Sequence, residues 1–292
     1  MTGDMPRFIF TVSTGRSGQA SLTGFFERFV PDCLALFEEP QINPILPGPA
    51  GNLERRFRRR FIETHELLGR GRVLTAFDNG DEAALEQMAQ ARVDWMLRQA
   101  ARHKAALVAD ISKHFVHGLH RHTIRILGDA TLIHLIRDPI QNMRSYLNRS
   151  KNFYLDNNSP GSRFNQLTLD PEDLGAGELY LWSWCETYLR GDALAAEYDL
   201  PRVVEIRTED MNNAETMSRH FSALGITHNR IEALPPRNTN IASGFGNTAV
   251  SIDDIEVFER FIDRIPSTTL DRIRFLADYD PRERHILAAR SA

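Results

Sequence analysis

The fold is decided by the stretch Phe8-Ile9-Phe10-Thr11-Val12-Ser13-Thr14-Gly15-Arg16-Ser17-Gly18-Gln19-Ala20-Ser21-Leu22. It opens with an apolar run rich in residues that favour β-strands, and small, polar and cationic residues follow. From Leu22 onward, apolar side chains recur with the spacing of one helical face, at Leu22, Phe25, Phe26 and Phe29. The pattern predicts a strand, a tight loop and a helix.

Such a loop can wrap backbone N–H groups around a phosphate, because the first turn of a helix has unpaired donors and a positive dipole end. Gly15 and Gly18 permit the necessary dihedrals, and Arg16 adds a permanent charge. An ordinary strand-to-helix turn is the alternative. Loops that bind nucleoside triphosphates end in Gly-Lys-Ser/Thr, whereas here Gln19 and Ala20 follow Gly18. We therefore expect any nucleotide to bind without that lysine and its metal partner.

A second motif begins at the end of the predicted strand 131–136. Arg137 comes first, Asp138 can cap the next helix, and Pro139 suits its first turn. Ser145 lies further along the same predicted helix. Arg137 and Ser145 could therefore converge on one phosphate. A capped helix start without a ligand is the alternative for this motif taken alone.

Together the two motifs resemble those of sulfotransferases that use 3′-phosphoadenosine-5′-phosphosulfate (PAPS). Arg16-Ser17-Gly18 resembles the loop for the 5′-phosphosulfate, although Gln19 replaces its usual Thr or Ser. The string Ile-Arg-Asp-Pro-x4-Arg-Ser-Tyr, which begins at Ile136, resembles the motif for the 3′-phosphate. The resemblance implies that PAPS is the sulfuryl donor, that 3′-phosphoadenosine-5′-phosphate (PAP) is released and that no metal is required. It places nucleotide contacts at Gly15, Arg16, Ser17, Gly18, Gln19, Ala20, Arg137, Ser145 and Arg237.

The resemblance implies an α/β fold of the P-loop-like sulfotransferase type, with a doubly wound central parallel sheet flanked by helices. With 292 residues, 42% of them hydrophobic, the chain can bury one large core. We expect a single domain over 1–292, with helical or loop insertions near 41–104 and 150–175. Further strands are expected within 33–40, 73–77, 105–115 and 201–211, and Asp81 is expected to cap a helix over 82–104.

The segments that are expected to contact the acceptor resemble the family less specifically than the two phosphate motifs do. Glu39-Pro40 resembles a Glu-Pro step found near the acceptor in this family, and Asp110 to His114 loosely resembles a segment that supplies the catalytic base. The ordinary pKa of histidine, roughly 6.5, suits proton removal near neutral pH. The catalytic candidates are therefore Arg16, His114 and Glu39, while Asp110, Lys113 and His117 are rivals of His114 for the role of base.

Two other segments each allow two interpretations. The arginine-rich run 53–61 has Leu53 and Phe57 on one helical face, which fits either a solvated amphipathic helix or a rim that attracts an anionic acceptor. The connection 149–171 is expected to be mobile and to cover the site as a lid, with a variable surface loop as the alternative.

Composition limits the partners. With 35 Lys and Arg against 39 Asp and Glu, the net charge of −4 does not favour non-specific binding of nucleic acid. The two cysteines, Cys33 and Cys185, have no metal-binding or disulfide spacing. No signal peptide or membrane-spanning run is recognised, so we expect a soluble, cytoplasmic protein. The acceptor is expected to be a small molecule, a sugar or a lipid; the sequence fixes neither it nor the oligomeric state. A P-loop kinase-like phosphotransferase and an inactive nucleotide-binding protein are the alternative functions.

Overall fold

A five-stranded, all-parallel sheet forms the centre of the computed structural model, which describes residues 5–40, 45–61, 71–149, 152–234 and 249–287. The strand order is β2-β3-β1-β4-β5. The central strand β1 pairs Phe8 with Val108 of β3 and Thr11 with Ile133 of β4. The predicted parallel α/β sheet is thus confirmed. The strands are β1 (Arg7–Val12), β2 (Cys33–Leu36), β3 (Leu107–Asp110), β4 (Thr131–Ile136) and β5 (Val203–Arg207).

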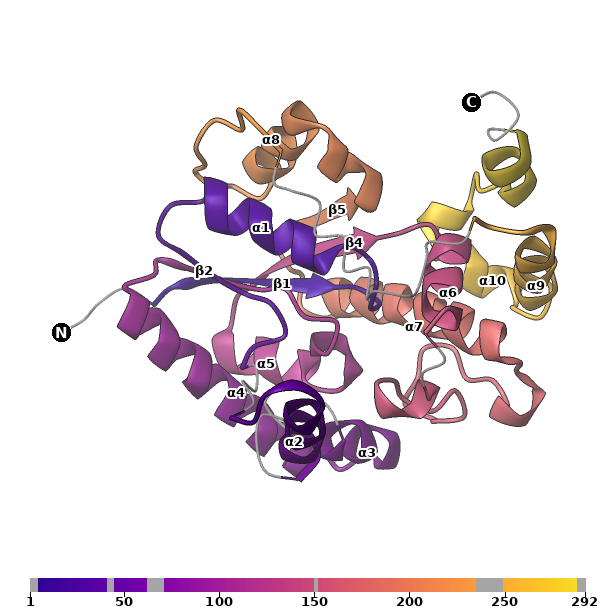
Figure 1. Ribbon diagram of the computed structural model, residues 1–292, viewed down its shortest axis with the longest axis horizontal. Helices are drawn as coiled ribbons and strands as arrows, with labels where there is room; N and C mark the ends of the chain where they lie inside the picture. The colour runs from indigo at the N-terminus through magenta and orange to yellow at the C-terminus, as the bar shows by residue number, and fades with distance from the viewer. Residues whose placement is uncertain (1–4, 41–44, 62–70, 150–151, 235–248, 288–292) are drawn as a thin grey trace.

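Helices cover both faces of the sheet (Figure 1). Successive residues of β1 point to opposite faces, so Ile9 packs on one side with Phe26 and Phe221, whereas Phe10 packs on the other side with Phe115. The first face is covered by α1 and α8, and the second by α4, α5 and part of α7. The helices are α1 (Gln19–Phe29), α2 (Gly48–Phe61), α3 (Arg72–Asn79), α4 (Glu82–His103), α5 (His120–Leu127), α6 (Pro139–Leu147), α7 (Ala176–Glu197), α8 (Ala214–Ala223), α9 (Ile252–Ile262) and α10 (Ser267–Leu270).

Two predicted helix starts are confirmed. The side chain of Asp81 accepts a hydrogen bond from the Ala84 N–H at the start of α4, at 3.1 Å. Asp138 does the same for the Gln141 N–H at the start of α6, where Pro139 occupies the first turn. Each cap satisfies a backbone donor that the helix itself leaves unpaired.

The strand predicted at 73–77 is wrong, because these residues belong to helix α3. Val73, Ala76 and Phe77 recur with helical spacing, and they form a small core with Leu85 of α4. Short apolar runs fit either a buried strand or one face of a helix, and here packing against α4 selects the helix.

The segment 152–175 is anchored to helix α7 by buried polar groups, contrary to the expected mobile lid. The Glu186 carboxylate accepts hydrogen bonds from the N–H groups of Gln166 and Leu167, at 3.0 and 2.7 Å. Arg190 donates to the side-chain oxygens of Asn158 and Asn165, at 2.9 and 2.8 Å. The segment is therefore a fixed part of the structure. It contains two short helical turns, η2 (Phe153–Leu155) and η3 (Pro171–Asp173).

We predict that Arg190→Met lowers the free energy of unfolding by about 3–5 kcal/mol, because it leaves the buried Glu186 carboxylate without its cation, 2.5 Å away. The control is Arg121→Met, which breaks an exposed pair with Glu197 and should cost at most about 1 kcal/mol. Urea denaturation measures both. Equal losses in the two variants would contradict the anchoring role of Arg190.

Candidate active site

The loop between β1 and α1 has the conformation of an anion-binding loop. Arg16 and Gly18 adopt left-handed φ angles of 70° and 91°. The φ of Gly18 is one that residues with a side chain rarely adopt, so glycine is favoured at this position, and a Cβ atom there would also displace Cε of Met211, 2.6 Å away. No side chain caps the N-terminus of α1, and its first turn holds no acidic residue. The first N–H groups of α1, together with its positive dipole end, are thus available to an anion.

The loop is held from its inner side by side chains. The Ser17 hydroxyl is fully buried and lies 2.9 Å from the Thr14 hydroxyl, and it accepts a hydrogen bond from Asn142 Nδ2 at 3.2 Å. Gln19 Nε2 donates to the Thr14 carbonyl at 2.7 Å. The side chains of Ser17 and Gln19 therefore shape the loop, and any contact of these residues with a nucleotide falls to their backbone.

The two motifs identified in the sequence meet in space. Arg16 Nε donates to Ser145 Oγ at 3.1 Å, and Arg137 Nη1 donates to the Arg16 carbonyl at 3.0 Å. Asn142, from the same helix as Ser145, donates to the Gly15 carbonyl at 3.0 Å. The carboxyl ends of β1 and β4 thus bring Arg16, Arg137 and Ser145 together, as parallel sheets of this kind do at their functional edge.

Positive charge is concentrated at this edge. Burial, followed by the neighbouring charges of Arg149 and Arg137, lowers the pKa of Arg16, and burial also lowers the pKa of Arg137. Arginine nevertheless stays protonated in proteins, so like charges are held near one another. An anion bound between them would relieve this repulsion. Lys113 contributes a further cation, whose Nζ lies 3.2 Å from Oδ2 of Asp156.

The acceptor-side candidates lie at the carboxyl ends of β2 and β3. His114 is buried, and its Nε2 is 4.0 Å from Oε1 of Glu38. The ring of His117 packs edge-on against that of His114, with the centroids 5.7 Å apart. Lys113 joins this side to the phosphate loop, since its Cδ lies 3.0 Å from where a Cβ on Gly15 would be. The structure thus places the Glu38 carboxylate near His114, while the neighbouring Lys113 lies beside the β1–α1 loop.

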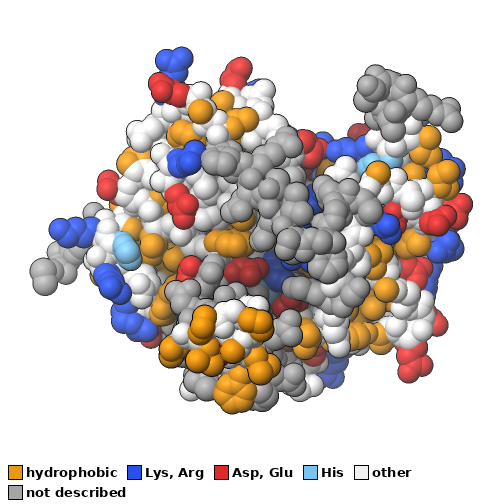
Figure 2. Space-filling model, viewed as in Figure 1, with side chains coloured by type: hydrophobic (Ala, Val, Ile, Leu, Met, Phe, Trp, Pro, Cys, Tyr) orange, Lys and Arg blue, Asp and Glu red, His pale blue; other side chains and the backbone are white. Residues whose placement is uncertain are grey.

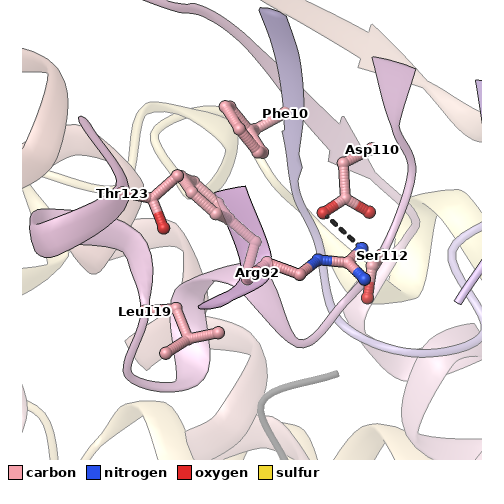
Figure 3. Close-up of a pocket in the computed structure, with 7 residues that line it drawn as sticks. Phe10, Arg92, Asp110, Ser112, Leu119 and Thr123 are labelled. Atoms are coloured by element: carbon pink, nitrogen blue, oxygen red, sulfur yellow. Dashed lines mark hydrogen bonds and ion pairs between the residues drawn. The ribbon is translucent and has the colours of Figure 1, made fainter. Parts of the chain in front are cut away.

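A buried ion pair joins Arg92 of α4 to Asp110 at the end of β3 (Figure 3). Arg92 of α4 donates to Oδ2 of Asp110 at 2.8 Å, and it also donates to the Glu39 carbonyl. Asp110 and Thr123 line a small cavity beside this pair. Arg92 thus engages Oδ2 of Asp110, whereas Oδ1 is buried without a hydrogen-bond partner among the described residues, and the role of Asp110 as a base stays a prediction.

The Arg-Asp-Pro motif is tied to residues near the end of the described chain. Asp138 accepts a hydrogen bond from the Tyr279 hydroxyl at 2.8 Å, lies 3.1 Å from His285 Nε2 and pairs with Arg284 Nε at 3.1 Å. Burial alone would raise the pKa of Asp138. The hydrogen bonds from His285, from the Gln141 N–H and from Tyr279 outweigh burial, and the pKa is lowered.

Sequence reasoning missed several supporting residues. Thr208 donates its hydroxyl to the carbonyls of both Ser17 and Ile136, at 3.0 Å each. Asn142 lies within the recognised motif and could have been noticed there. Arg92 interrupts an apolar stripe of α4 between Met88 and Met96, which is a signal that a buried partner exists. Arg237 and the glycine-rich run 243–247 lie outside the described residues.

Neither a metal site nor a membrane-spanning helix is found among the residues that the structure describes. No group of three or more His, Cys, Asp or Glu side chains is arranged to hold a metal ion in this part of the chain. Among the helices of the same residues, none has both the length and the apolar character needed to cross a bilayer.

We predict that Asp138→Asn lowers the free energy of unfolding by about 2 kcal/mol near neutral pH, because it weakens charge-assisted hydrogen bonds. A carboxylate with a lowered folded pKa stabilises above its ordinary value of 3.8, and this stabilisation is lost as the pH falls through the folded pKa. The difference between wild type and variant should therefore shrink in acid. Urea denaturation at a series of pH values measures it.

The control for this prediction is Asp253→Asn, at an exposed position in the first turn of α9. It should change stability little at any pH. A wild-type advantage over Asp138→Asn that stays constant into strong acid would contradict the proposed role of the Asp138 charge.

Comparison with known proteins gives a distant structural likeness. No protein-family model matches the chain, and no curated protein matches it significantly. Among solved structures, the chain is similar to the sulfotransferase domain from the Synechococcus PCC 7002 olefin synthase. The two are 17% identical, the match covers 91% of this chain and 98% of that domain, and the TM-score is 0.44.

Proposed function

We propose that this protein transfers a sulfuryl group from PAPS to a hydroxyl or amine of a small-molecule, sugar or lipid acceptor and releases PAP. The observation that carries the proposal is the meeting of the two phosphate motifs. Arg16 reaches Ser145 at 3.1 Å, and Arg137 reaches the Arg16 carbonyl at 3.0 Å. A cationic site assembled from two loops suits a nucleotide that carries two separate phosphate groups.

The residues present fit this donor. The uncapped first turn of α1, at residues 18–20, and Arg16 would hold the 5′-phosphate end. Arg137 and Ser145 would hold the 3′-phosphate, since a guanidinium and a hydroxyl both donate to phosphate oxygens. When bound, PAPS supplies the sulfuryl group. The crowding of Arg16, Arg137 and Arg149 supports an anionic ligand at this place.

The chain's own residues can assist the transfer in two ways. As the bond from sulfur to the phosphate oxygen breaks, negative charge grows on that oxygen, and Arg16 with the loop N–H groups stabilises it. The acceptor oxygen or nitrogen bonds to sulfur and gives up a proton. His114 takes this proton in our proposal, and the Glu38 carboxylate, 4.0 Å from its Nε2, stabilises the resulting imidazolium. Glu39 would contact the acceptor in this proposal. Its backbone is held by Arg92, which donates a hydrogen bond to the Glu39 carbonyl.

A kinase-like phosphotransferase is the main alternative. Gln19 and Ala20 stand where that class has lysine and a metal-binding hydroxyl, and the Gln19 side chain bonds back to Thr14. A protein that binds the nucleotide without transferring the sulfuryl group is the second alternative. Binding and turnover are therefore tested separately.

We predict that PAP raises the melting temperature without added metal. A ligand at 100 times its dissociation constant adds about 2.7 kcal/mol to the stability of the folded state. Arg137→Gln should reduce the shift. The matched control is Arg144→Gln on α6, whose guanidinium lies 3.5 Å from Asp254 of α9, and it should leave the shift unchanged. A shift with ADP only when magnesium is present, and none with PAP, would favour the kinase-like alternative.

We predict that Arg16→Ala lowers turnover by about 10²-fold or more once an acceptor is found, because a positioned cation acts mainly on the transition state. His114→Ala should lower turnover while leaving the PAP-induced thermal shift intact, since His114 faces the acceptor side. Assays of PAP release from PAPS with candidate acceptors measure both. Turnover by His114→Ala equal to wild type would remove histidine from the role of base.

A further inference from the structure

Helix α2 turns apolar side chains toward solvent. Leu53 is 70% exposed and Phe57, one helical turn later, is 54% exposed. Among the residues of α2 whose burial is described, Gly51 alone is buried. In an ordinary surface helix the apolar stripe faces the core. Leu53 and Phe57 instead present more than half of their side-chain surface to solvent.

The turn before α2 extends this apolar area. Oε2 of Glu54 accepts hydrogen bonds from the N–H groups of Ile45 and Leu46, at 2.9 and 2.8 Å. These bonds hold the turn against the helix, and the side chains of Ile45 and Leu46 are 84% and 51% exposed. We call Ile45, Leu46, Leu53 and Phe57 the α2 surface. Figure 2 shows hydrophobic side chains gathered at the bottom of the view, where Figure 1 places α2.

Charge distinguishes the possible partners of the α2 surface. The sequence of α2 contains five arginines, all between residues 55 and 60, against the single acid Glu54, although the whole chain has a net charge of −4. A second copy of the chain docked through the same surface would bring like charges together. A layer of anionic lipid headgroups would instead attract the arginines and accept the apolar side chains at the acyl boundary.

We propose that the α2 surface docks the protein on anionic lipid surfaces. Leu53 and Phe57 enter the interface between headgroups and acyl chains, and the net positive charge of the α2 sequence attracts headgroup phosphates. The proposal does not depend on sulfuryl transfer, because it rests on the exposure and charge of α2 alone.

Flotation of the full-length protein with lipid vesicles tests the proposal. One set of vesicles is pure phosphatidylcholine, and the other also contains phosphatidylglycerol. Wild type should float with the mixed vesicles at low salt, bind the neutral ones much less, and detach as salt rises. The double variant Leu53→Ser/Phe57→Ser should bind the mixed vesicles about tenfold or more weakly, because it loses the apolar surface that would enter the interface.

The matched control is Ile252→Ser on α9, which removes an apolar side chain that is 57% exposed outside the α2 surface and should leave vesicle binding unchanged. Absence of binding to mixed vesicles at low salt would overturn the proposal, and so would equal binding by the double variant. Self-association in sedimentation velocity, abolished by the double substitution and without vesicle binding, would assign the surface to a second copy. The PAP thermal shift in the same samples tests the nucleotide site independently.

Discussion

The candidate site depends on one cross-connection, in which Arg16 and the Arg137 motif hold each other in place. The Arg16 side chain reaches out of the β1–α1 loop to Ser145 on α6, while Arg137 binds the carbonyl of Arg16 itself. Neither loop therefore fixes its arginine alone. The left-handed φ of Arg16, which is unfavourable for a residue with a side chain, is maintained by these contacts from a distant part of the chain.

This connection also explains the buried polar groups around the loop. Asn142, Thr208 and Gln19 each satisfy a backbone carbonyl of the loop or of a neighbouring strand. With its carbonyls bound from the inner side, the loop can turn its N–H groups outward. The fold also holds Arg16 near Arg137 and Arg149, and under the proposed function this preorganised positive charge would stabilise the negative charge that develops during transfer.

The sequence predicts correctly those features that depend only on neighbouring residues. The strand-loop-helix around Gly18 and the Asp138-Pro139 helix start follow from residues within one turn of each other, and both are as predicted. The helix at 72–79 was mistaken for a strand because its apolar spacing fits both periods until α4 is known to pack on it.

The residues that hold the site in place cannot be recognised from local sequence patterns. Arg92 meets Asp110 and the Glu39 carbonyl through tertiary contact alone, and the tail residues that bind Asp138 are more than a hundred positions away. The Glu186–Arg190 pair has the ordinary spacing of a helical ion pair, and nothing local shows that it anchors residues 158–167. To predict such contacts, one must know the order of the strands in the sheet, and the sequence motifs indicate this order only coarsely.

The position of β1 has a consequence for how the protein is made. Both neighbours of β1 are encoded much later, since Phe8 pairs with Val108 and Ile9 with Thr131, so closing these contacts requires long loops and slows folding. The Ser17 carbonyl accepts a hydrogen bond from Thr208, which lies 191 residues further along the chain and is therefore made late. A chain emerging from the ribosome thus carries β1 as an unpaired, apolar strand until β3, which ends at Asp110, has been made. Under the proposed function, nucleotide binding would report on completed folding, because the site needs both β1 and β4.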